Sequence, residues 1–218
     1  MQQKLWRGQK LRSLNDYQII FSDTEKLELK SDSHPFALSF RISTFESSSE
    51  QNRFIKNCER LIRISTEYKH WREYIRDVLE INSCFLTNES SDECTVEIHH
   101  HIPSLFTIVK GVVNKKISNQ EEFCTFDICL EVMRLHFENR VGYVCLVKTL
   151  HEKFHNGFLE IPVELVQGDY VSFLNEYEQY LDPEDIDTIR KRLAVKAKDN
   201  QLYFWSKDNY PRLRDLGV

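Results

Sequence analysis

Two histidine-bearing segments constrain the fold of this chain most. The first, VEIHHHIP at residues 96–103, is a strand-like run that ends in three consecutive histidines. The second, VGYVCLVKTLHEKFHNG at 141–157, predicts a strand followed directly by a helix that stops at its Asn-Gly pair. His151 and His155 are four positions apart, so both imidazoles project from one face of that helix. This spacing suits two ligands of one cation.

The rest of the pattern predicts a mixed α+β fold. Short β-prone runs at 17–45 indicate a small antiparallel meander, and SSSE at 47–50 offers an N-cap to helices that continue to residue 79. A polar turn, NESSDE, separates two further β-prone runs and predicts a hairpin of 83–87 with 94–100. Helical spacing returns further along the chain, at 105–113, 126–137, 169–181 and 183–196.

We therefore expect three parts in a chain of 218 residues. Residues 1–80 form an N-terminal strand meander with helices, 81–160 form a core that carries the histidines and a helical insertion, and 161–218 form a C-terminal helical tail. This length supports a hydrophobic core without disulfide bonds.

Composition excludes several classes of protein. The net charge is −5, which argues against coating nucleic acid by bulk attraction. The basic segment 53–76 is either a local patch or a solvated helix face. No apolar run is long enough for a membrane span, and the six cysteines form no CxxC pair. We expect a protein of the cytoplasm with reduced thiols and no membrane partner.

The three consecutive histidines supply the remaining candidates for a metal site. His99 as a third ligand completes a set of three imidazoles, which is typical of catalytic sites that leave one position open. His100 then stands beside the cation as a general base, because an imidazole pKa near 6.5 lies close to neutral pH. A shift of one residue would exchange the roles of neighbouring histidines. Glu97 either orients a ligand histidine or faces solvent.

These residues resemble the HNH endonucleases, whose pattern is approximately Glu-x-His-His-x-x-Pro, an Asn-bearing strand, and His-x-x-x-His. The matching stretches are EIHHHIP at 97–103 and HEKFHNG at 151–157, and the resemblance extends over 83–157. It implies a ββα-metal core of the phage type, related to treble-clef folds, in which a helical insertion separates the two halves.

The resemblance also implies an activity. The protein would hydrolyse DNA phosphodiester bonds with a divalent metal, Mg²⁺, Mn²⁺ or Zn²⁺, and work in the cytoplasm of a bacterial host. The implied metal ligands are His99, His151 and His155, and the implied catalytic residues are His100 and Glu97.

Three further residues are candidates for contact with substrate. The middle asparagine of the family would fall near Gly142, and Asn139 is the nearest asparagine. Arg134 and Arg140 are the arginines nearest in sequence that can balance transition-state charge. His136 lies on a predicted helix and is expected to be a helix-face residue rather than a metal ligand.

A second function stays open. The acidic charge, the displaced asparagine and the long terminal segments favour a weakly active or inactive protein with a nuclease fold, which acts as a binding or assembly factor in a phage or host complex. In that case the terminal segments bind the partner protein and the histidines hold a structural ion or none.

Overall fold

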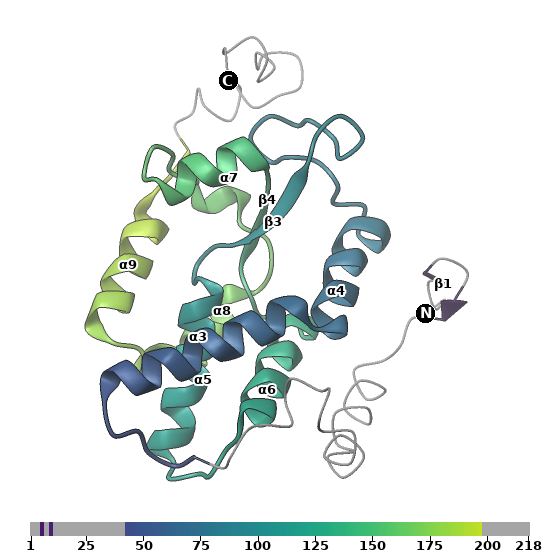
Figure 1. Cartoon of the computed structure of the whole chain (residues 1–218). Helices are drawn as coiled ribbons and strands as arrows, with labels where there is room; N and C mark the ends of the chain where they lie inside the picture. Colours follow the sequence, from purple (N-terminus) through teal and green to yellow (C-terminus); the bar gives the residue numbers. More distant parts are fainter. Residues whose placement is uncertain (1–4, 7–8, 11–41, 198–218) are drawn as a thin grey trace.

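The computed structural model describes residues 5–6, 9–10 and 42–197 (Figure 1). Within these ranges helices surround a pair of antiparallel strands, which agrees with the predicted α+β class. A second, isolated pair joins β1 (Leu5–Trp6) to β2 (Gln9–Lys10). The predicted meander lies almost wholly outside the described residues, as does the end of the tail. None of the described helices is both long and apolar enough to cross a membrane.

Serine caps set the first helices. α3 (Ser48–Ile64) begins after Ser47, whose side chain accepts a hydrogen bond from the Glu50 N–H, as the SSSE signal predicts. Ser65 ends α3 and also caps α4 (Thr66–Glu73), since its hydroxyl accepts from the Tyr68 N–H. α4 continues into the π-helical η2 (Tyr74–Val78). The sequence pattern of this segment allows one long helix or two consecutive helices, and the structure has two, α3 and α4.

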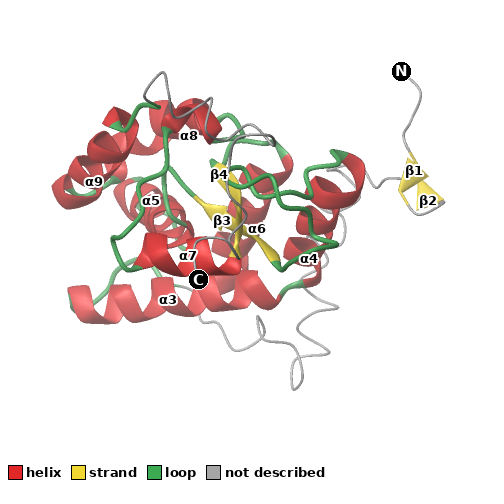
Figure 2. Cartoon of the chain, turned by 90° about the horizontal axis from the view of Figure 1, so that it is seen from above, coloured by secondary structure: helices red, strands yellow, loops and turns green. Residues whose placement is uncertain are grey.

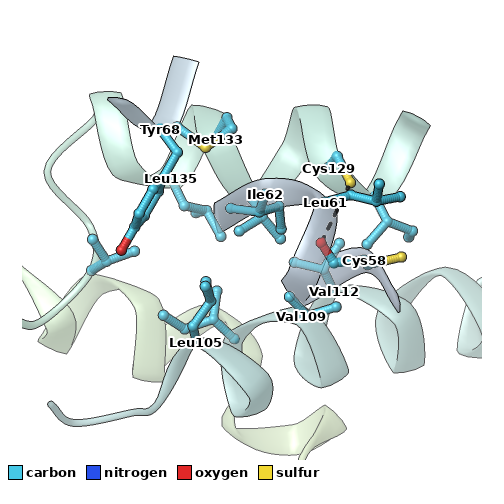
Figure 3. Packing of buried hydrophobic residues seen from close by; sticks show 14 of the residues in the cluster. Cys58, Leu61, Ile62, Tyr68, Leu105, Val109, Val112, Cys129, Met133 and Leu135 are labelled. Carbon is cyan, nitrogen blue, oxygen red and sulfur yellow. Dashed lines mark hydrogen bonds between the residues drawn. The ribbon is translucent and has the colours of Figure 1, made fainter. Parts of the chain in front are cut away.

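The main hydrophobic core lies where α3 packs against α5 (Leu105–Ser118) and α6 (Thr125–Phe137) (Figure 3). Most of its side chains are aliphatic residues at helical spacing, and each of these contributes about 1.5–3 kcal/mol when fully buried. Tyr68 of α4 and Phe173 and Tyr177 of α8 (Tyr170–Tyr177) join this cluster. Residues from each of the three predicted parts, 1–80, 81–160 and 161–218, therefore contribute to this core.

Strand β3 (Val96–His100) pairs with β4 (Tyr143–Val147), so the hairpin predicted with residues 83–87 is wrong. The register joins Val96 to Val147 and His100 to Tyr143. Residues 83–87 instead form a turn, in which the Cys84 N–H donates to the Glu89 carbonyl. The polar signal NESSDE is therefore a local turn, and the true partner strand lies beyond α5 and α6.

The two faces of the β3–β4 pair are covered by different helices (Figure 2). α7 (Lys148–His155) follows β4 directly and packs on the face that carries Val144 and Leu146. Leu150 of α7 belongs to the same hydrophobic cluster as these two residues. α4 contacts the other face through Trp71, whose ring lies 5.6 Å from that of Tyr143. Successive β3 side chains consequently enter different environments.

The C-terminal part packs against α5. It comprises η3 (Val163–Leu165), α8 (Tyr170–Tyr177), η4 (Glu178–Tyr180) and α9 (Pro183–Ala194). Lys110 of α5 forms ion pairs with Asp182 and, at 2.7 Å, with Asp185, at the start of α9. The Pro at the first turn and the basic last turn of α9 match the sequence prediction.

Gly142 lies where β4 meets the chain that leaves β3. A Cβ atom there would lie 2.3 Å from the His101 carbonyl oxygen and 2.6 Å from that of Ile102. We expect Gly142→Ala to lower the free energy of unfolding by about 2–3 kcal/mol, because backbone atoms must move. Urea unfolding of the full chain measures this change.

Gly157→Ala is the control for this prediction. Gly157 has φ +74 and nothing within 4 Å of its added Cβ, so only the left-handed conformation is strained, at a cost of about 1 kcal/mol. An equal loss in the two variants would show that close packing at Gly142 does not matter.

Candidate metal centre

Three histidine side chains converge between β3 and α7. His99 lies on the β3 face that α7 covers, because its cross-strand partner is Val144. α7 starts opposite Val96 and folds back over this face, which brings His151 to His99. His155 follows one turn later on the same side of α7. The structure therefore brings together the three residues that the sequence proposes as ligands.

One nitrogen of each ring points to a common centre. His99 Nδ1 lies 2.8 Å from His151 Nε2, and His155 Nε2 lies 2.9 Å from the same atom. All three candidate ligand atoms are within 4.8 Å of one another. Three imidazoles at this spacing form a donor set for Zn²⁺ or a similar borderline cation, with at least one coordination position left for another ligand.

Glu97 orients His151. Its Oε2 lies 2.5 Å from His151 Nδ1, and a carboxylate accepts a hydrogen bond, so Nδ1 carries the proton. The Nε2 lone pair then faces the centre. This carboxylate–histidine pair is the usual support of a metal-bound imidazole. Of the two roles open to Glu97, contact with a ligand histidine is the one that the geometry shows.

Burial favours the neutral form of two of the candidate ligands, His99 and His155. It lowers the pKa of His99 to about 2, with further lowering by the charges of His151, His101, His155 and Arg192. Burial, His151, Arg63 and Arg192 also lower the pKa of the more exposed His155. Neutral imidazoles have the free lone pairs that metal binding needs at neutral pH.

His100 lies away from the cluster, in contrast to its expected place beside the cation. Its ring stacks on Tyr68 and Trp71 of α4, with centroid distances of 5.9 and 5.6 Å, and it is almost completely buried. The reason is strand alternation, which turns the side chains of His99 and His100 to opposite faces. The general-base position that the HNH pattern implies for His100 is not met.

His100 has a buried partner that the sequence did not predict. His136 lies on α6, as expected of a helix residue; it is buried, and its Nδ1 lies 2.6 Å from the Val132 carbonyl oxygen. Since a carbonyl only accepts, Nδ1 donates, and His136 Nε2 is left to accept from His100 Nε2 at 2.8 Å. Burial lowers the pKa of His136 to about 4 and that of His100 well below its usual value.

His101 shares the side of His99. Its ring centroid is 6.2 Å from that of His99 and 5.2 Å from Phe154 of α7. It is almost fully buried, and burial together with the charge of Arg192 lowers its pKa to about 3. Of the three consecutive histidines, the first and third therefore lie near α7 and the second lies near α4.

The structure does not bring the three other candidate substrate residues to the cluster. Arg134 pairs with Glu131 at 2.5 Å, and Arg140 pairs with Glu176 at 2.6 Å. The Asn139 carbonyl accepts from the Asp169 N–H, and Asn139 adopts φ +59 in the turn after α6. Asn139 and Arg140 thus join the turn after α6 to α8, whereas Arg134 pairs within α6. Proximity in sequence was misleading because β4 carries the chain away before α7 begins.

Sequence reasoning missed Arg192 of α9. Its guanidinium lies over the Phe154 ring, 5.4 Å from the centroid, next to the centre. Sequence spacing offers no signal for this contact, because α9 reaches the centre only through tertiary packing.

Removal of one ligand tests the centre directly. His155 is the exposed ligand, so His155→Ala should leave the fold intact and abolish stoichiometric Zn²⁺ binding. Glu97→Gln should lower Zn²⁺ affinity about 10- to 100-fold through loss of the orienting carboxylate. Isothermal titration calorimetry measures both affinities.

Glu152→Gln is the matched control, since Glu152 follows His151 in α7 but its side chain is 64% exposed. Its Zn²⁺ affinity should equal that of the wild type. Wild-type affinity in His155→Ala would contradict the three-histidine centre.

The His100–His136 pair predicts acid sensitivity of the metal-free protein. The unfolded state takes up protons near pH 6.5, whereas folded His136 does so only near pH 4. The free energy of unfolding should therefore fall as pH drops from about 6.5 to about 4, by at most ~1.4 kcal/mol per pH unit for each such histidine.

Urea unfolding at several pH values in the presence of a chelator measures this slope. His136→Gln keeps a group that can accept from His100 and removes one titrating ring, so its slope should be shallower. Identical slopes in variant and wild type would contradict the assignment.

Comparison with known proteins identifies a family. Searches of curated proteins and of solved structures gave no match to this chain. A family model described as "Bacteriophage G278-like virion protein" matches residues 3–208, a range that includes the three histidines of the centre and Glu97. The match extends over nearly all of the sequence, and the chain therefore belongs to the bacteriophage G278-like virion protein family.

Proposed function

We propose that this phage virion protein is a metal-dependent endonuclease of the HNH type that hydrolyses DNA phosphodiester bonds at the His99–His151–His155 centre. The observation that carries the proposal is the donor set: three imidazoles converge, and a carboxylate orients the middle one. Sites with three protein ligands leave room for a substrate oxygen or water, whereas closed structural sites use four.

A divalent cation held by these nitrogens would polarise a phosphate oxygen and lower the pKa of a bound water, as DNA hydrolysis requires. The protein contributes fixed ligand geometry and His151 basicity through Glu97. β3 supplies Glu97 and His99, and α7, which follows β4, supplies His151 and His155; this order of strand, strand and helix supports a ββα-metal assignment. Because His100 is enclosed by α4 and α6, we do not assign it the base role.

The enclosure of His100 between α4 and α6 favours a second function. A nuclease-fold protein without a general base at its metal centre is suited to a structural role, in which the cation ties β3 to α7. Membership of a virion protein family and the net charge of −5 support this reading. In this alternative the protein is an assembly factor that binds a phage or host protein through its terminal segments.

Nicking of supercoiled plasmid distinguishes the two functions. We expect the full-length protein to nick DNA with at least one of Mg²⁺, Mn²⁺ and Zn²⁺ and to stop when chelator is added. His155→Ala should reduce nicking to background, because the cation loses a ligand.

Glu152→Gln is again the control and should nick at the wild-type rate. Tight metal binding without nicking under any condition would refute the nuclease and leave the structural centre. Nicking that persists in His155→Ala would place the activity elsewhere or in a contaminant.

A further inference from the structure

Arg192 supplies a positive charge beside the metal centre. It lies in the last turn of α9, half-buried, with its guanidinium over the Phe154 ring of α7. Its charge lowers the pKa of His99, His101 and His155, so it lies within electrostatic reach of two ligands and of the neighbouring histidine. α9 thus places the Arg192 guanidinium at the edge of the centre that β3 and α7 form.

This guanidinium has no anionic partner within the described part of the chain. Three other arginines of that part are paired with glutamates: Arg63, which also reaches His155, lies 2.8 Å from Glu59, and Arg134 and Arg140 have their own glutamates. Burial lowers the pKa of Arg192, as expected for a charge removed from water without an opposite charge nearby.

Its neighbours on α9 behave differently. Arg190 and Lys191 are 73% and 75% exposed, and each has an acidic residue within 4.0 Å. The face of Phe154 and the carboxyl end of the α9 dipole stabilise the Arg192 charge in part. Neither offers the in-plane acceptor oxygens that a guanidinium binds by two parallel hydrogen bonds.

We propose that Arg192 is an oxyanion-binding residue of this centre, which holds a phosphate group of the ligand while the three histidines hold the cation. The inference rests on the proposed function and deepens it, since it assigns a residue that binds the phosphodiester. A planar fork with five N–H donors matches phosphate oxygens, and phosphate supplies the negative charge that the site lacks. Cation and guanidinium then bind the same group from two sides.

Calorimetric titration of the full-length protein tests this role in two steps. Zn²⁺ alone is titrated first, and inorganic phosphate is then titrated into the Zn²⁺-loaded protein. We expect Arg192→Gln to bind Zn²⁺ like the wild type and to bind phosphate at least 10-fold more weakly. Arg192→Lys keeps the charge but loses the fork, so its phosphate affinity should fall between the two. Arg190→Gln, on the exposed side of α9, should match the wild type in both titrations.

The outcomes separate this inference from the proposal on which it rests. If Zn²⁺ binds and phosphate affinity is equal in Arg192→Gln and wild type, Arg192 is not an oxyanion-binding residue and the metal centre stands. If wild type binds no Zn²⁺, the centre itself fails and the inference fails with it. If Arg192→Gln does not fold, Arg192→Lys decides, because its stem still packs on Phe154: unchanged phosphate affinity there overturns the inference.

Discussion

The antiparallel pairing of β3 with β4 is the constraint on which the site depends. It joins segments that α5 and α6 separate in the chain, and it places the start of α7 opposite Val96. Because α7 follows β4 without a loop, the register of this one pair decides where His151 and His155 lie relative to His99. A slip by one residue would turn His99 toward α4 and turn His100 toward α7 in its place.

The same pairing divides the consecutive histidines between two environments. On the α7 side, His99 and His151 form a polar cluster with Glu97, above the apolar residues Val144 and Leu146. On the α4 side, His100 is part of an aromatic and imidazole core together with Trp71. Burial keeps both His99 and His100 neutral. The neutral ring of His99 on the α7 side is available to a cation, whereas His100 on the α4 side hydrogen-bonds to His136.

Much of the fold could be predicted from local pattern. Helical spacing located α5, α6, α7 and α9 to within a few residues, and the apolar run at 141–147 located β4, because these signals depend on near neighbours in the chain. The partner of β3 was predicted wrongly. A polar turn next to a β-prone run looks like a hairpin, and nothing local shows that the turn is closed by its own hydrogen bonds, such as Cys84 N–H to Glu89.

The candidate site shows the same division between local and tertiary information. The four-residue spacing of His151 and His155 and the family resemblance of the surrounding residues were sufficient to identify the three candidate ligands that the structure brings together. The face of β3 on which each histidine lies depends on the register, so adjacency to His99 gave the wrong surroundings for His100. Arg192 depends on the packing of α9 beside α7, which no motif encodes. Candidate ligands held by one strand and one helix are therefore predictable from sequence, whereas the guanidinium beside them comes from an element that only the folded chain brings there.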